Sequence, residues 1–258
     1  MSDGPAERSV TDDAFLGGAL RILQPKDGYR AGVDAVLLAA SAPAKAGRRE
    51  RVLDVGAGVG VVGLAVARRI ADAEIVLVER DPRLAELARA NVERNGLSER
   101  VRVIEADVER PLRGQPAIAA LAESFDHVLA NPPFHTEGRG TAAADTAKAA
   151  ANAMAEGSLI GWSRFLAAMA RPSGTAAVIH KAEALAALLA ACEGRFGALE
   201  VLPIHPRRDA RAIRVIVRGI KGSRAPLSLL PQLTLHGDDN GFRPEIERVL
   251  RGGAGLES

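Results

Sequence analysis

The chain of 258 residues is poor in cysteine and aromatic side chains, and it has no long hydrophobic run. Cys192 is its only cysteine, which excludes a disulfide framework and favours a reducing compartment. No apolar stretch approaches the roughly 18–20 residues that a membrane-spanning helix needs, and residues 1–13 lack the apolar stretch of a signal peptide. We therefore expect a cytoplasmic protein that does not bind a membrane.

Alanine and arginine, in contrast, are abundant. The chain holds 49 Ala, and 29 of its 34 basic residues are Arg. With 47% hydrophobic residues it can bury enough apolar surface to offset its ordering entropy, which predicts a folded protein. Codon usage in a GC-rich genome accounts for both excesses, and phosphate binding by clustered arginines is the alternative for Arg. The net charge of +2 does not separate these two explanations.

Apolar, β-branched runs alternate with helix-like stretches through the middle of the chain. We expect strands at 51–55, 74–79, 101–105 and 125–130, helices at 61–70 and 82–95, and a short helix within 24–42. This alternation predicts an α/β fold with a doubly wound parallel sheet. Residues 1–24 have a mixed pattern and are expected to be partly mobile. Later helix and strand signals lie at 159–170, 175–180, 182–191, 199–204, 212–220 and 242–250.

A glycine-rich turn follows the first of these strands. It reads Asp54-Val-Gly-Ala-Gly-Val-Gly60, and its glycines Gly56, Gly58 and Gly60 permit positive φ and a close approach of a ligand to the backbone. Together with Gly63 and Glu79 the turn also satisfies a dinucleotide fingerprint. The Asp54 carboxylate, however, opposes a pyrophosphate at the helix N-terminus and fits a cationic group such as an amino-acid ammonium. An oxidoreductase is therefore disfavoured.

Two further carboxylates follow the next two strands. Glu79 is placed to accept hydrogen bonds from ribose hydroxyls, and Asp107 to accept one from the exocyclic amine of adenine. An amino acid, a ribose and an adenine together describe S-adenosylmethionine. The alternative is that the glycines only pack a helix on a strand and the acids are surface caps.

The segment Val52-Leu-Asp-Val-Gly-Ala-Gly-Val-Gly60 resembles the first motif of class I S-adenosylmethionine-dependent methyltransferases. Glu79 and Asp107 stand where that family places its ribose and adenine contacts. The resemblance implies a Rossmann-like, doubly wound, mainly parallel sheet of seven strands.

The tetrapeptide Asn131-Pro132-Pro133-Phe134 follows the fourth strand, at the carboxyl edge of the sheet where ligands bind. The Asn131 side-chain oxygen and the Pro132 carbonyl can both accept from one planar amine, and Phe134 offers a face for stacking. The tetrapeptide resembles the signature of methyltransferases that act on adenine N6, guanine N2 or a glutamine amide. The resemblance implies that these four residues are catalytic and that Asn131 also contacts the cofactor. A turn without function is the alternative.

The flanks of the chain narrow the resemblance to one group. Residues 24–38 and 233–250 are similar to the ends of the bacterial tRNA(Val) adenine-N6 methyltransferases, in which the stretch matching Arg30, Gly32 and Asp34 lies over the methionine end of the cofactor. Val33 stands where that group usually has threonine. The resemblance implies an N-terminal helical cap (1–45) on a methyltransferase domain (46–258), within one structural domain.

A basic stretch at 205–224 contains seven basic residues and one acid, a local charge of +6. Clustered guanidinium groups favour binding to RNA phosphates, and tRNA is the expected partner. A solvated strand edge is the alternative. The residues that we assign to RNA binding are Arg207, Arg208, Arg211 and Arg214. The dispersed histidines predict no metal site.

The sequence thus predicts an N-methyltransferase for the exocyclic amine of an RNA base, with adenine N6 in tRNA as the first choice. His135 is more typical of the rRNA guanine-N2 methyltransferases, so the base stays open. A protein glutamine methyltransferase and a cofactor-binding protein without transferase activity are further alternatives. The Ala-rich stretch 141–157 is a candidate lid or substrate loop.

Overall fold

The computed structural model describes residues 10–27, 30–43, 49–133, 158–239 and 241–256. Phe134, His135 and the Ala-rich stretch 141–157 lie outside these ranges. The strands of the main sheet are β3 (Arg51–Val55), β4 (Glu74–Glu79), β5 (Val101–Glu105), β6 (Phe125–Ala130), β7 (Ala170–Lys181), β8 (Phe196–His205), β9 (Arg214–Lys221), β10 (Ser228–Leu229) and β11 (Leu233–Thr234).

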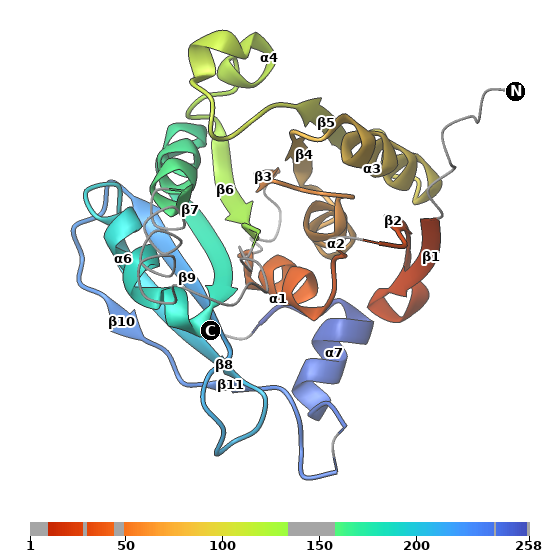
Figure 1. Cartoon of the computed structure of the whole chain (residues 1–258), viewed down its shortest axis with the longest axis vertical. Helices are drawn as coiled ribbons and strands as arrows, with labels where there is room; N and C mark the ends of the chain where they lie inside the picture. Colours follow the sequence, from red (N-terminus) through yellow and green to blue (C-terminus); the bar gives the residue numbers. More distant parts are fainter. Residues whose placement is uncertain (1–9, 28–29, 44–48, 134–157, 240, 257–258) are drawn as a thin grey trace, which may run out of the picture.

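The strands follow the order β10-β8-β9-β7-β6-β3-β4-β5, and β11 also pairs with β8 (Figure 1). β3 pairs in parallel with β4 and β6, β5 with β4, and β7 with β6. β9 lies antiparallel between β7 and β8. The doubly wound, mainly parallel sheet expected from the alternation is therefore confirmed, with two short additional strands along β8.

Helices cover both faces of the sheet, and each face has its own core. One core includes residues of α1 (Val33–Ser41), α2 (Val61–Arg69), α3 (Pro82–Arg94) and α7 (Pro244–Gly252). The other includes residues of the helix at 158–169, α4 (Pro116–Ala119) and α6 (Leu185–Cys192). The central parallel strands β3, β4 and β6 are buried on both faces, and all six residues of β6 are buried.

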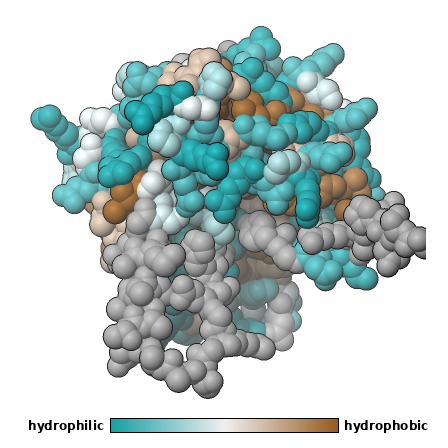
Figure 2. Space-filling view, turned by 45° about the horizontal axis from the view of Figure 1, so that its top comes forward, coloured by the Kyte–Doolittle hydropathy of each residue, from teal (hydrophilic) through white to brown (hydrophobic). Residues whose placement is uncertain are grey.

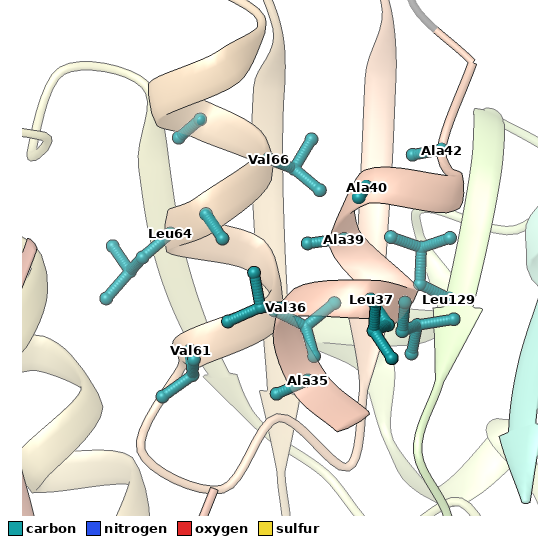
Figure 3. Close-up of a cluster of buried hydrophobic side chains, with 14 of the residues drawn as sticks. Ala35, Val36, Leu37, Ala39, Ala40, Ala42, Val61, Leu64, Val66 and Leu129 are labelled. Carbon is teal, nitrogen blue, oxygen red and sulfur yellow. The ribbon is translucent and has the colours of Figure 1, made fainter. Parts of the chain in front are cut away.

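Alanine makes close helix packing possible in the first core. Figure 3 shows α1 lying beside α2, with Ala39 and Ala40 on α1 near Val66 of α2. Leu37 of α1 points instead toward Leu129 of β6, and both side chains are at most 1% exposed. A buried alanine leaves room for the neighbouring backbone, so α1 contacts both α2 and the sheet.

The N-terminal segment differs from the expectation of a mixed, partly mobile stretch. β1 (Val10–Phe15) and β2 (Leu20–Pro25) form an antiparallel hairpin around the 3-10 turn η1 (Leu16–Gly18). Alternate residues of β2 are buried, with Leu20 and Ile22 fully so. The expected helical cap is thus a hairpin followed by one helix, α1.

Side-chain amides of α3 hold this hairpin in place. Asn91 is fully buried; its Oδ1 accepts from the Leu23 backbone nitrogen at 2.7 Å, and its Nδ2 donates to the Leu23 carbonyl at 3.0 Å. Asn95 pairs in the same way with the backbone of Arg21. These bonds satisfy the backbone groups of β2 that face away from β1.

Among the described helices, none is long and apolar enough to cross a membrane. The face shown in Figure 2 is largely hydrophilic, with small hydrophobic areas between polar residues.

Candidate cofactor site

The glycine turn between β3 and α2 adopts a backbone that favours glycine. Gly56, Gly58 and Gly60 have φ values of 68°, 57° and 92°. A Cβ on Gly56 would lie 2.4 Å from Cη2 of Trp162, whereas a Cβ on Gly58 would meet nothing within 4 Å. The turn is thus packed on one side by a buried indole and open on the other, where a ligand can approach the backbone.

Asp54, at the end of β3, lies beneath this turn. It is 1% exposed, and its Oδ2 accepts a hydrogen bond from the Gly63 backbone nitrogen in the first turn of α2 at 2.9 Å. Burial raises the pKa of this carboxyl to about 7; the charge of Glu79 adds to the rise, and the bond from Gly63 opposes it. A cation that enters the site would favour the ionised form.

Glu79 ends β4 and organises the loops around it. Its Oε2 accepts from the Gly58 nitrogen at 2.8 Å, and its Oε1 accepts from the nitrogens of Arg80 and Asp81 at 2.8 and 2.9 Å. One carboxylate therefore joins the glycine turn to the β4–α3 loop. The side chain still lines the adjoining cavity and can accept from a ligand hydroxyl there.

A cavity of about 300 Å³ brings together expected site residues from three separate loops. Its lining includes Gly56, Gly58, Glu79, Asn131 and Pro133. A smaller neighbouring pocket shares the two glycines and Asn131 and reaches Asp54. The end of β3, the end of β4 and the Asn-Pro-Pro turn after β6 therefore meet at one edge of the sheet, as parallel strands require.

Asp107 does not line that cavity. It borders a more open hollow of about 550 Å³ together with Arg80, Arg110 and Arg113. Its Oδ1 accepts from the Glu109 nitrogen, and the Gln115 side chain bonds both the nitrogen and the carbonyl of Asp107, at 2.7 and 2.9 Å. The adenine contact assigned to Asp107 remains a prediction.

The three N-terminal residues assigned to the cofactor have other contacts. Arg30 pairs with Asp13 of β1 at 2.5 Å, Gly32 precedes α1 as its N-cap, and Asp34 pairs with Arg214 of β9 at 2.7 Å. Their neighbours Ala31 and Ala35 line the smaller pocket instead. Sequence alone could not show which residues of this segment line the pocket.

The basic stretch also divides in the structure. Arg207, Arg208 and Arg211 are exposed in the turn between β8 and β9. The remaining basic residues include Arg214, Arg218 and Lys221, which pair with acids that lie outside the stretch: Asp34, Glu200 and Glu123. The local charge of +6 therefore overstates what the turn presents to a polyanion.

Sequence reasoning missed several residues of the cavity wall. Trp162 packs on Gly56 and also lines the cavity, as Asn131 does. Glu109 also lines the cavity, and its carboxylate accepts hydrogen bonds from the side chains of Arg80 and Ser158. An indole in a helical pattern and an acid in a loop carry no local signal that identifies such positions.

These features fit S-adenosylmethionine. A cationic amino acid suits the buried Asp54 carboxyl, and the open side of the glycine turn admits a ligand close to the backbone. Glu79 would hold the ribose, and Gly56, Gly58 and Asn131 would surround the methionine portion. The fold and this edge of the sheet are those of a class I methyltransferase.

Comparison with known proteins identifies the family. The model of the methyltransferase small domain matches residues 32–168. The crystal structure of a predicted O-methyltransferase from Agrobacterium tumefaciens is 32% identical and aligns with a TM-score of 0.72, covering 86% of this chain and 98% of that one. The chain belongs to the methyltransferase small-domain family, whose cofactor is S-adenosylmethionine.

Two relatives carry a more specific name, tRNA1(Val) (adenine(37)-N6)-methyltransferase. The protein from Shewanella loihica is 36% identical over 112 residues, and that from Escherichia coli O157:H7 is 36% identical over 110 residues. The matches cover 43% and 42% of this chain, and 44% and 42% of the two relatives. The similarity therefore spans less than half of the length of these relatives.

Proposed function

We propose that this protein transfers a methyl group from S-adenosylmethionine to the exocyclic amine of a base in RNA, with adenine N6 in tRNA as the substrate. The carrying observation is that one cavity of about 300 Å³ joins Glu79 and the glycine turn to Asn131 and Pro133. The residues that we assign to the cofactor and to the acceptor therefore line a single cavity. The name shared by the Shewanella and Escherichia relatives supports the choice of tRNA.

Methyl transfer from this cofactor requires mainly that the protein position the two reactants. S-adenosylmethionine supplies an activated methyl group on a positively charged sulfur. Asn131 and the Pro132 carbonyl would hold the two hydrogens of a planar amine, which orients the nitrogen lone pair toward the methyl carbon. Pro132 is buried and its ring fixes φ, so this carbonyl is held in place. Phe134 would stack on the base.

An amine acceptor fits the turn better than a hydroxyl does. A hydroxyl offers one hydrogen to two acceptors and needs a base to remove it, whereas an NH2 group donates to both acceptors. The name of the Agrobacterium protein points to an oxygen acceptor for that protein. Guanine N2 in rRNA is the second candidate here, because His135 follows Phe134.

Product analysis tests the proposal. The protein is incubated with isotopically labelled S-adenosylmethionine and, separately, tRNA and rRNA that lack the modification, and digested nucleosides are examined by mass spectrometry. Labelled N6-methyladenosine from tRNA is the expected product. Labelled N2-methylguanosine from rRNA would support the second candidate, and methylated glutamine in an added protein would overturn both. Cofactor binding without any methyl transfer would indicate a binding protein.

A further inference from the structure

An ion pair links two parts of the chain that the sequence assigned to different ligands. Nε of Arg214, at the start of β9, donates to Oδ2 of Asp34, in the first turn of α1, at 2.7 Å. The two residues are 180 positions apart, and each side chain is 26% exposed. Nη1 of Arg214 also donates to the Ile213 carbonyl at 3.0 Å, so two contacts fix the guanidinium.

The charges around this pair favour its persistence. His180 lies beside Arg214, and burial lowers the pKa of its imidazole to about 4, with the charges of Lys181 and Arg214 adding to the effect. His180 is therefore neutral at pH 7, and Asp34 supplies the negative charge. Asp34 in turn lies in the first turn of α1, where a carboxylate is favoured by the helix dipole.

On the α1 side, the pair lies next to residues that line the candidate cofactor site. Ala31 and Ala35 flank Asp34 and line the small pocket that also contains Asp54, Gly56 and Asn131. The N-cap Gly32 forms no side-chain cap, so α1 begins without that common restraint. The bond from Arg214 supplies a restraint at the same end of the helix.

On the other side, the pair is joined to the exposed basic turn. Arg214 pairs in register with Lys181 of β7 and Ile204 of β8. Arg207, Arg208 and Arg211 lie in the turn that leads directly into it. The position of Arg214 is therefore set by the sheet and by the turn that we assign to RNA binding.

We propose that Arg214 is a positioning residue for the cofactor rather than an RNA ligand: through Asp34 it fixes the start of α1 against the methionine end of the site. This inference rests on the proposed cofactor binding. It replaces the direct phosphate contact that the sequence assigned to Arg214, and it leaves RNA contact to the three exposed arginines of the turn.

A double-mutant cycle tests the inference. S-adenosylmethionine affinity is measured by calorimetry, and affinity for unfractionated bacterial tRNA by filter binding, for Asp34→Asn, Arg214→Gln and the double variant. Arg214→Gln is expected to raise the cofactor Kd about three- to tenfold and to change the tRNA Kd less than about twofold. The double variant is expected to bind cofactor no more weakly than Asp34→Asn, because Arg214 acts through Asp34.

Arg218→Gln is the matched control. It removes the same charge from the same strand, but its partner Glu200 lies in β8 and not in α1. We expect its cofactor Kd to stay within about twofold of the wild-type value. The reversed pair Asp34→Arg with Arg214→Asp is expected to recover part of the affinity lost by Arg214→Asp alone.

The outcomes separate this inference from the proposed function. Additive effects in the cycle, or an Arg214→Gln variant that loses tRNA affinity and keeps cofactor affinity, would overturn the positioning role alone. A wild-type protein that binds no S-adenosylmethionine would overturn the proposed function together with it.

Discussion

The buried carboxyl of Asp54 makes cofactor binding dependent on pH. In the free protein its pKa is about 7 instead of 3.8, mainly because burial disfavours the charged form. That difference corresponds to about 4 kcal/mol, at about 1.4 kcal/mol for each tenfold change in the ionisation constant. An ammonium group beside the carboxyl would return the pKa toward its ordinary value, so cofactor binding below pH 7 should release a proton.

The size of this pH dependence follows from the linkage between proton binding to Asp54 and cofactor binding. With a pKa near 7 before binding and near 4 after it, the cofactor association constant should rise about tenfold per pH unit between about pH 5 and 6.5 and level off above about pH 7. At pH 6.5 about 0.8 proton should be released per cofactor bound, because that fraction of Asp54 is protonated in the free protein. Calorimetry in two buffers of different ionisation enthalpy measures this number.

Asp54→Asn is the informative variant, because an amide can still accept from Gly63 but cannot ionise. We expect it to bind the cofactor weakly and with no pH dependence over this range. The free variant should also be more stable than the wild type at pH 8. The folded-state pKa lies above the unfolded one, so the wild-type carboxyl loses stability as the pH rises from about 4 to 7. A wild-type slope near zero, or the same slope in the variant, would refute this reasoning.

Three further predictions concern other parts of the site. Asn131→Ala should lower the methyl-transfer rate by about 100-fold or more, a larger effect than its effect on cofactor affinity, which radiolabel transfer and calorimetry would show; near-normal turnover would contradict the amine contact. Gly56→Ala should cost about 2 kcal/mol in denaturant unfolding, since its Cβ meets Trp162 at 2.4 Å, whereas Gly114→Ala, with no atom within 4 Å, should cost under about 1 kcal/mol. Equal costs would refute the packing argument. Replacing the exposed arginines of the β8–β9 turn, Arg207, Arg208 and Arg211, by alanine should weaken tRNA binding. The slope of the logarithm of the tRNA association constant against the logarithm of salt concentration should become shallower by about 0.7–0.9 for each arginine removed. An unchanged slope would show that the turn is not part of the RNA interface.

The local sequence pattern was sufficient to predict the parallel strands β3 to β6. Strands at 51–55, 74–79, 101–105 and 125–130 were expected from short runs rich in apolar and β-branched residues, and β3 to β6 have these bounds. Such runs suit strands that are buried on both faces, so the signal does not depend on distant contacts. The glycine turn was recognised for the same reason, because its backbone conformation is dictated by neighbouring residues.

The N-terminal hairpin was missed because its first strand violates strand propensity. β1 carries Asp12 and Asp13, and acidic residues are depleted in strands. In the structure Asp12 pairs with Arg21 and Arg94, and these bonds hold the pKa of its carboxyl below the ordinary value. β2 buries alternate residues, but its sequence Leu-Arg-Ile-Leu-Gln-Pro does not alternate apolar with polar residues, so it gave no clear strand signal either.

Strands β3 to β6, the helices between them, the glycine turn and the Asn-Pro-Pro turn could be predicted from the sequence alone, because these depend on residues close together in the chain. Tertiary structure decided which charged groups pair with each other and which are buried. The sequence suggested that Arg214 and Asp34 each contact a ligand. In the structure they form an ion pair with one another, although they are 180 positions apart in the chain. Asp54 acquired its pKa of about 7 through burial. Ion pairing and desolvation depend on distance and solvent exclusion in the folded molecule, and residue spacing encodes neither.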